Sequence, residues 1–139
     1  MNTSERLRVL YVEDDCDSLQ MLEVMLDLSR IDVECATSIV EALRSSALER
    51  FDLYLLDSDL PDGSGLTLCR TLRTVDPETP ILFYSGSAHP DEIKMGIEAG
   101  ADGYITKPHS DRLAPIIIQL VASYRANSLQ SLPVLALAA

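Results

Sequence analysis

The sequence predicts a single α/β domain in which a doubly wound parallel sheet carries helices on both faces. Five short apolar runs, at residues 9–12, 33–36, 53–56, 81–84 and 103–106, alternate with longer segments whose apolar residues recur at the helical period. Several of these runs are almost continuously apolar, which is typical of parallel strands buried on both faces. The chain has 139 residues, a length that suits one domain.

The composition of the runs indicates where each strand lies in the sheet. The first, third and fourth runs are the most apolar, so we expect them at the centre. The second run is more polar and suits an edge. We assign residues 1–127 to the domain and residues 128–139 to an apolar C-terminal tail.

The segments between the runs carry helix signals. Residues 16–29 place Leu19, Leu22 and Leu26 on one helical face. Ser38 and Glu41 have the spacing of a capping box, in which each side chain binds a free backbone donor of the other residue.

Proline and glycine set the bounds of the later helices. A helix over residues 64–75 follows a glycine-containing turn, and Pro90 opens the next helix, for which Gly100 is the C-cap candidate. Pro115 falls in the first turns of the last helix, which therefore either begins near Ala114 or is kinked.

Charge and cysteine content limit the classes of function. Eleven basic and 22 acidic residues give a net charge of −11, which argues against direct nucleic-acid binding. No run approaches the roughly 20 apolar residues of a membrane span, and the N-terminus does not resemble a signal peptide. Three cysteines without metal-ligand spacing indicate free thiols, so we expect a cytoplasmic protein without a zinc site; they are Cys16, Cys35 and Cys69.

Chemically active side chains follow four of the five predicted strands. Ligands of doubly wound sheets bind at the carboxyl ends of the strands, so we expect these side chains to share one crevice. Several carboxylates in one crevice need a cation, and a site with oxygen ligands alone favours Mg²⁺. No glycine-rich loop follows the first run, so a dinucleotide site is unsupported. The side chains are Glu13, Asp14, Asp57, Asp59, Ser85 and Lys107.

This set of residues suits phosphoryl transfer. Mg²⁺ would remove the repulsion between a carboxylate nucleophile and an anionic phosphoryl group. Lys107 would supply a positive charge to one phosphoryl oxygen, and the Ser85 hydroxyl would donate to another.

Four segments, residues 11–15, 56–65, 83–86 and 99–108, resemble the receiver domains of bacterial response regulators. The resemblance covers roughly residues 8–125, in the order and spacing of that family. It implies a flavodoxin-like fold with strand order 2-1-3-4-5.

The resemblance also implies roles for the acidic residues. Asp57 would be the phosphoacceptor, Asp14 the direct metal ligand, and Glu13 its water-mediated neighbour. The backbone carbonyl of Asp59 would complete the protein's share of the Mg²⁺ ligands.

Further roles follow from the same family. Ser85 would be the switch hydroxyl that turns toward the new phosphoryl group, and Tyr104 the aromatic whose rotamer follows it. Lys107 would bind the phosphoryl group, with Pro108 after a cis peptide bond.

In that family the domain is a phosphoacceptor and not a turnover enzyme; its chemistry is Mg²⁺-dependent self-phosphorylation and autodephosphorylation. The implied donor is a sensor histidine kinase or a phosphotransfer protein. The implied recipients of the signal are a downstream protein target and, as a further option, a second copy in a homodimer.

The chain departs from the family pattern at several positions. Ser58 stands where an aliphatic residue is usual, His109 where an aromatic is common, and Pro115 interrupts the last helix. Asp59 and Ser87 occupy positions that influence the lifetime of the acyl phosphate in that family.

Two alternative functions remain open. Asp57-Ser58-Asp59 also matches the nucleophile motif of haloacid-dehalogenase phosphatases, although here an acidic pair precedes it and no cap domain fits the length. A degenerate receiver that acts only by binding other proteins is the second. Each residue also has a purely structural interpretation, such as Tyr104 as core packing and Lys107 as a surface lysine.

Overall fold

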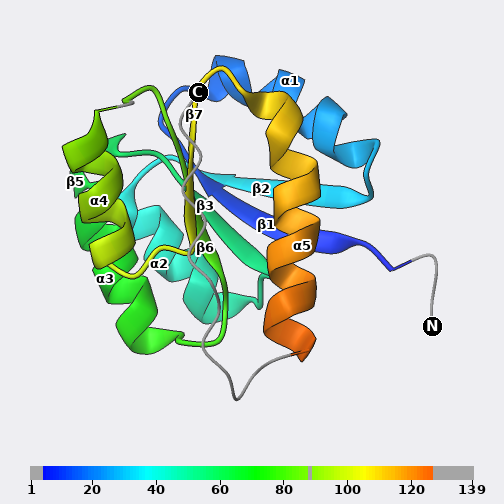
Figure 1. The fold of residues 1–139 in the computed structure, drawn as a ribbon. Helices are drawn as coiled ribbons and strands as arrows, with labels where there is room; N and C mark the ends of the chain where they lie inside the picture. The colour runs from blue at the N-terminus through cyan, green and yellow to red at the C-terminus, as the bar shows by residue number, and fades with distance from the viewer. Residues whose placement is uncertain (1–4, 88, 127–139) are drawn as a thin grey trace.

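The computed structural model describes residues 5–87 and 89–126. Its main sheet has five parallel strands in the order β2-β1-β3-β6-β7 (Figure 1). The predicted class and order are confirmed, because β6 and β7 are the fourth and fifth strands of this sheet. The expected tail, residues 128–139, lies outside the described residues. The strands are β1 (Leu7–Val12), β2 (Ile31–Ala36), β3 (Leu53–Leu56), β6 (Ile81–Ser85) and β7 (Gly103–Thr106).

The helices cover both faces of the sheet. One apolar core lies between the sheet and α1 and α5, and a second lies between the sheet and α2, α3 and α4 (Figure 1). Within the described ranges no helix is long and apolar enough to cross a membrane. The helices are α1 (Cys16–Asp27), α2 (Ile39–Leu48), α3 (Gly65–Val75), α4 (Pro90–Glu98) and α5 (Leu113–Ala126).

The two cores explain why the central strands are continuously apolar. Successive side chains of a strand point to opposite faces of the sheet. In β1, Val9 and Tyr11 therefore join the core under α1 and α5, and Leu10 and Val12 join the other. All four are at most 1% exposed, so no position of this part of β1 suits a polar residue.

The start of α2 differs in part from the predicted capping box. The Ser38 hydroxyl accepts a hydrogen bond from the Glu41 N–H at 3.1 Å, as expected. The Glu41 carboxylate accepts instead from the backbone N–H of Thr37, at 3.3 Å, so the reciprocal half of the prediction is wrong. Asp62, from a distant loop, accepts from the Ile39 N–H at 2.8 Å and satisfies another of the helix's free donors.

The predicted limits of α4 and α5 agree with the structure. Pro90 is the first residue of α4, and Gly100 follows its end with φ +114°, a conformation that favours glycine. A 3₁₀ turn, Ser110–Arg112, precedes α5, which begins at Leu113. Pro115 therefore lies in the first turn, where its missing N–H would have no partner within the helix.

A short antiparallel pair after β3 was not predicted. It joins β4 (Asp59–Leu60) to β5 (Gly63–Ser64) and leads directly into α3. The Ser64 hydroxyl caps α3 by accepting from the Leu66 N–H at 3.0 Å. The pair holds the loop that follows Asp57 in a defined position.

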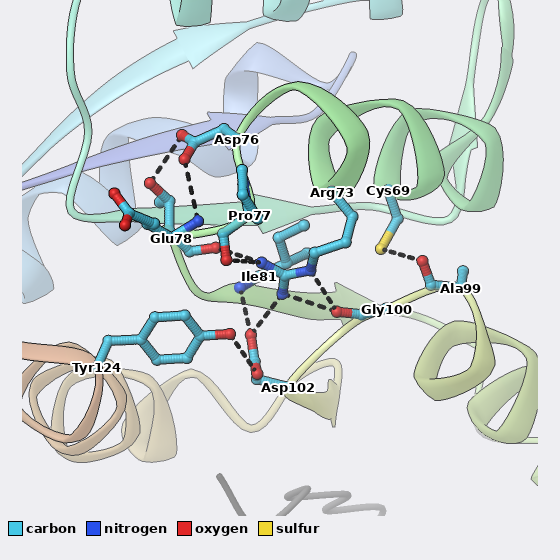
Figure 2. Close-up of polar contacts among 11 residues, drawn as sticks. Cys69, Arg73, Asp76, Pro77, Glu78, Ile81, Ala99, Gly100, Asp102 and Tyr124 are labelled. Carbon is cyan, nitrogen blue, oxygen red and sulfur yellow. Dashed lines mark hydrogen bonds and ion pairs between the residues drawn. The ribbon is translucent and has the colours of Figure 1, made fainter. Parts of the chain in front are cut away.

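Arg73 makes a set of polar contacts that join α3 to the chain around the starts of β6 and β7 (Figure 2). The Arg73 guanidinium of α3 donates to the Gly100 carbonyl at 2.7 and 3.0 Å and to the Thr79 carbonyl at 2.8 Å. It also pairs with the Asp102 carboxylate at 2.8 Å, which accepts from the Tyr124 hydroxyl of α5 at 2.7 Å. Arg73 therefore links α3 to the chain before β6 and, through Asp102, to β7 and α5.

Replacing Arg73 by alanine is expected to lower the free energy of unfolding by roughly 2–4 kcal/mol. The change leaves two carbonyls and the half-buried Asp102 carboxylate without this donor. Urea unfolding measures the effect, and Arg70→Ala, an exposed arginine on the same helix, is the matched control. Equal effects of the two substitutions would contradict the assigned role.

Candidate functional site

The predicted acidic residues meet at the carboxyl ends of β1 and β3. Backbone hydrogen bonds continue the ladder one residue past each strand, from the Glu13 N–H to the Ala36 carbonyl at 2.9 Å and from the Asp57 N–H to the Val12 carbonyl at 3.0 Å. Glu13, Asp14 and Asp57 each offer a carboxylate oxygen, and these oxygens lie within 4.8 Å of one another. The sequence-based prediction that these three side chains share a crevice agrees with this geometry.

Lys107 supplies the cation next to this cluster. Its backbone N–H donates to the Ser85 carbonyl at 2.8 Å, which fixes the chain just after β7. Its ammonium lies 3.0 Å from Glu13 Oε1 and 3.8 Å from Asp57 Oδ1, and 5.6 Å from the centre of the Tyr84 ring. The peptide bond between Lys107 and Pro108 is cis, as the resemblance implied.

The charges at the site do not balance. Three carboxylates face one ammonium, and like charges this close disfavour joint ionisation. Glu13 is 3% exposed, and its Oε2 is buried with no hydrogen-bond partner in the described part of the chain. A buried, unpartnered carboxylate oxygen beside an exposed Asp14 and a half-buried Asp57 fits a hard cation with oxygen ligands.

The pKa of Glu13 reflects this imbalance. Burial first, and the neighbouring Asp57 carboxylate second, raise it from the ordinary value of 4.5 to about 7. The Lys107 ammonium acts in the opposite direction. Without a metal, Glu13 therefore binds a proton near neutral pH in the folded protein but not in the unfolded chain.

We expect this shift to make the metal-free protein less stable as pH rises from about 4.5 to 7. Over that interval the folded state holds the Glu13 proton that the unfolded state has lost, so the stabilisation present at acid pH disappears. The contribution is roughly 3–4 kcal/mol, since the pKa rises from 4.5 to about 7 and one pKa unit corresponds to about 1.4 kcal/mol. Urea unfolding in EDTA at several pH values measures it. Glu13→Gln should flatten the profile, and an unchanged slope in that variant would contradict the assignment.

The predicted switch residues lie on the other side of Asp57. Ser85 and Tyr104 are 2% and 1% exposed, and the Tyr104 ring stacks on Phe83 with 5.5 Å between centroids. The Ser58 hydroxyl donates to Ser85 Oγ at 2.7 Å and lies 3.3 Å from the Tyr104 hydroxyl oxygen. The sequence marked Ser58 only as an unusual residue. A hydroxyl directly after Asp57, just beyond an apolar strand, was the available signal of these contacts.

Two other predictions concern residues near the cluster. Asp59 lies in β4 with an exposed side chain, outside the three-carboxylate group, and a role for its backbone carbonyl stays a prediction. Cys35 and Cys69 are thiols outside any disulfide in the described part of the chain, as expected, whereas the side chain of Cys16 is not described.

Comparison with known proteins identifies relatives of this chain. The family model described as the response regulator receiver domain matches residues 9–118. The chain is 38% identical over 119 residues to the transcriptional regulatory protein PrrA of Mycobacterium tuberculosis, covering 86% of this chain and 48% of PrrA. It is 40% identical over 123 residues to the cell cycle response regulator CtrA of Brucella abortus, covering 88% of this chain and 53% of CtrA. The chain thus spans about half the length of these curated relatives.

Solved structures agree with this relationship. A CheY-like response regulator receiver domain protein from Methanospirillum hungatei superposes with a TM-score of 0.82 at 28% identity, over 88% of this chain and 99% of that one. The chemotaxis response regulator CheY4 of Vibrio cholerae superposes with a TM-score of 0.74 at 28% identity, over 84% and 99% of the two chains. From the matched residues and the shared fold, the chain belongs to the response regulator receiver domain family of two-component signalling.

Proposed function

We propose that this receiver domain takes a phosphoryl group on Asp57 from the phosphohistidine of a sensor histidine kinase or phosphotransfer protein. The observation that carries the proposal is the surroundings of Asp57, whose carboxylate lies beside those of Glu13 and Asp14 and 3.8 Å from the Lys107 ammonium. An aspartate that only ended a buried strand would need neither the two neighbouring carboxylates nor the ammonium.

The reaction is a single displacement at phosphorus. An Asp57 carboxylate oxygen forms the new O–P bond while the P–N bond of phosphohistidine breaks, and the imidazole leaves with its electron pair and takes up a proton. With acetyl phosphate as donor, the P–O bond to the acetyl group breaks and acetate leaves. Hydrolysis of the acyl phosphate later returns Asp57 to the carboxylate.

The proposed cofactor is Mg²⁺. Glu13, Asp14 and Asp57 would hold it through their carboxylates, with the backbone carbonyl of Asp59 as a further ligand. When bound, the ion neutralises the charge that opposes the approach of a carboxylate to a phosphoryl group.

Two residues bind the phosphoryl oxygens in this proposal. The Lys107 ammonium is 3.0 Å from Glu13 and 3.8 Å from Asp57, so a small rotation of its flexible side chain brings it to an oxygen on Asp57. The Ser85 hydroxyl would donate to a second oxygen. The ammonium charge and the two hydrogen-bond donors act in a partly buried site, where their interactions are stronger than in water.

The signal would leave the site through Ser85 and Tyr104. Tyr104 packs against Phe83, and a Cβ added to Gly96 of α4 would lie 3.2 Å from each of these two rings. Glycine at this position lets α4 approach the rings closely. A change in the position of Tyr104 would therefore shift α4 and alter the surface near α4, β7 and α5.

The partners follow from this mechanism. The donor is the kinase or phosphotransfer protein, and the recipient of the signal is a downstream protein or a second copy of the domain. The domain acts in the cytoplasm as a phosphoacceptor, not as a turnover enzyme, and does not bind nucleic acid directly. The net charge of −11 supports the last point.

Intact-mass measurement after incubation with acetyl phosphate and Mg²⁺ tests the proposal. We expect a gain of one phosphoryl group that EDTA prevents and that Asp57→Asn abolishes. Labelling of Asp57→Asn as strong as that of the wild type would contradict it. Steady turnover of phosphomonoesters would favour the phosphatase alternative, and failure to bind Mg²⁺ together with no labelling would favour a protein-binding module.

A further inference from the structure

Three hydroxyl groups form a partly buried cluster beside Asp57: those of Ser58 just after β3, Ser85 at the end of β6 and Tyr104 in β7. The Ser58 hydroxyl donates to Ser85 Oγ at 2.7 Å and lies 3.3 Å from the Tyr104 hydroxyl oxygen. The Tyr104 hydroxyl in turn donates to the Ser87 carbonyl at 2.9 Å. Ser58 is thus the member that contacts both of the other hydroxyls.

The bonds to Ser85 define its resting orientation. Ser85 Oγ accepts from the Ser58 hydroxyl and also from the Ser87 backbone N–H at 3.2 Å, so both of its lone pairs have a donor. Ser85 is 2% exposed, and a buried hydroxyl that moves must exchange these donors for others of similar strength. The backbone of Ser58 is itself held, because its carbonyl accepts from the Gly65 N–H at 2.8 Å.

We propose that Ser58 is a positioning residue that holds the Ser85 hydroxyl in its resting orientation and so weakens the binding of a phosphoryl group at Asp57. This inference rests on the proposed function, because it concerns the same site. In the proposed function the Ser85 hydroxyl turns toward a phosphoryl oxygen on Asp57, and this movement would take its Oγ out of the 2.7 Å contact with Ser58. An aliphatic side chain at position 58 would have no such bond to lose.

The size of the effect follows from the bonds exchanged. A neutral hydrogen bond changes an equilibrium by roughly two- to tenfold. After Ser85 leaves, the Ser58 hydroxyl can still donate to the Tyr104 oxygen 3.3 Å away, which offsets part of the loss. We therefore expect Ser58→Ala to bind a phosphoryl analogue about three- to fivefold more tightly than the wild type.

Titration with beryllofluoride, which mimics an aspartyl phosphate, in the presence of Mg²⁺ measures this affinity. Ser58→Thr keeps the hydroxyl and should bind like the wild type, which separates loss of the hydrogen bond from loss of volume. The gain from Ser58→Ala should disappear in a Ser85→Ala background, since the acceptor is then absent. Unchanged or weaker binding by Ser58→Ala, or the same gain in both backgrounds, would overturn the inference.

A second measurement does not depend on phosphoryl chemistry. The Ser87 amide donates to Ser85 Oγ, so its NMR chemical shift in the metal-free protein reports the position of that oxygen. Ser58→Ala should move this resonance, and Ser58→Thr should move it much less. If beryllofluoride bound to none of the proteins, the proposed function would fail, and an unmoved Ser87 amide would separately overturn the positioning role.

Discussion

Asp57→Asn is expected to make the metal-free protein more stable than the wild type at pH 8, by about 1–3 kcal/mol. The substitution removes one of three carboxylates whose oxygens lie within 4.8 Å of one another. The Lys107 ammonium keeps its closer partner, because it is 3.0 Å from Glu13 and 3.8 Å from Asp57. The repulsion lost is therefore larger than the attraction lost. Urea unfolding in EDTA measures the difference.

Two conditions make this test specific to the cluster. Asp59→Asn removes the same charge two residues away, at an exposed side chain outside the cluster, and should change stability little. Millimolar Mg²⁺ should stabilise the wild type more than Asp57→Asn, because at a given concentration a ligand stabilises the folded state more the more tightly it binds that state. A less stable Asp57→Asn in EDTA, or an equal gain from Asp59→Asn, would contradict the account of the site.

Gly65→Ala is expected to disrupt the site and lower the free energy of unfolding by roughly 2–4 kcal/mol. An added Cβ would lie 2.1 Å from the carbonyl oxygen of Asp57, a contact that only a backbone shift can relieve. The same methyl group would lie 3.1 Å from the ring of Phe83. Since the contact is to the backbone of Asp57, the shift should also reduce Mg²⁺-dependent labelling by acetyl phosphate.

Gly86→Ala is the matched control for this change. It adds the same methyl group one residue after Ser85, but nothing lies within 4 Å of the added Cβ. We expect a stability change within about 0.5 kcal/mol and nearly normal labelling. Similar losses in the two variants would mean that glycine is needed at this end of the sheet for a reason other than the contact with Asp57.

The sequence predicted the main sheet well, for physical reasons. Continuous apolar runs indicate strands buried on both faces, and β1 and β3 are covered by helices on each side. The more polar second run correctly predicted an edge strand. Because parallel strands end at one edge of the sheet, the positions of Glu13, Asp57 and Lys107 after their strands were enough to predict that they meet.

Long-range polar contacts could not be predicted in the same way. Asp62 satisfies the start of α2 from a loop more than 20 residues away, and no local pattern reports such a contact. The Glu41 carboxylate binds the N–H of Thr37 instead of that of Ser38, a choice between adjacent donors that spacing does not decide. The partners of Ser58 likewise lie on two other strands.

The measurement that most directly tests the central claim is to locate the phosphoryl group after labelling with acetyl phosphate and Mg²⁺. Borohydride reduces an aspartyl phosphate to homoserine, which peptide mass spectrometry assigns to a single position. The account predicts homoserine at position 57 alone. Homoserine at position 14 or 59 would contradict it. So would a phosphoryl group that resists reduction because it is esterified to a hydroxyl such as that of Ser85.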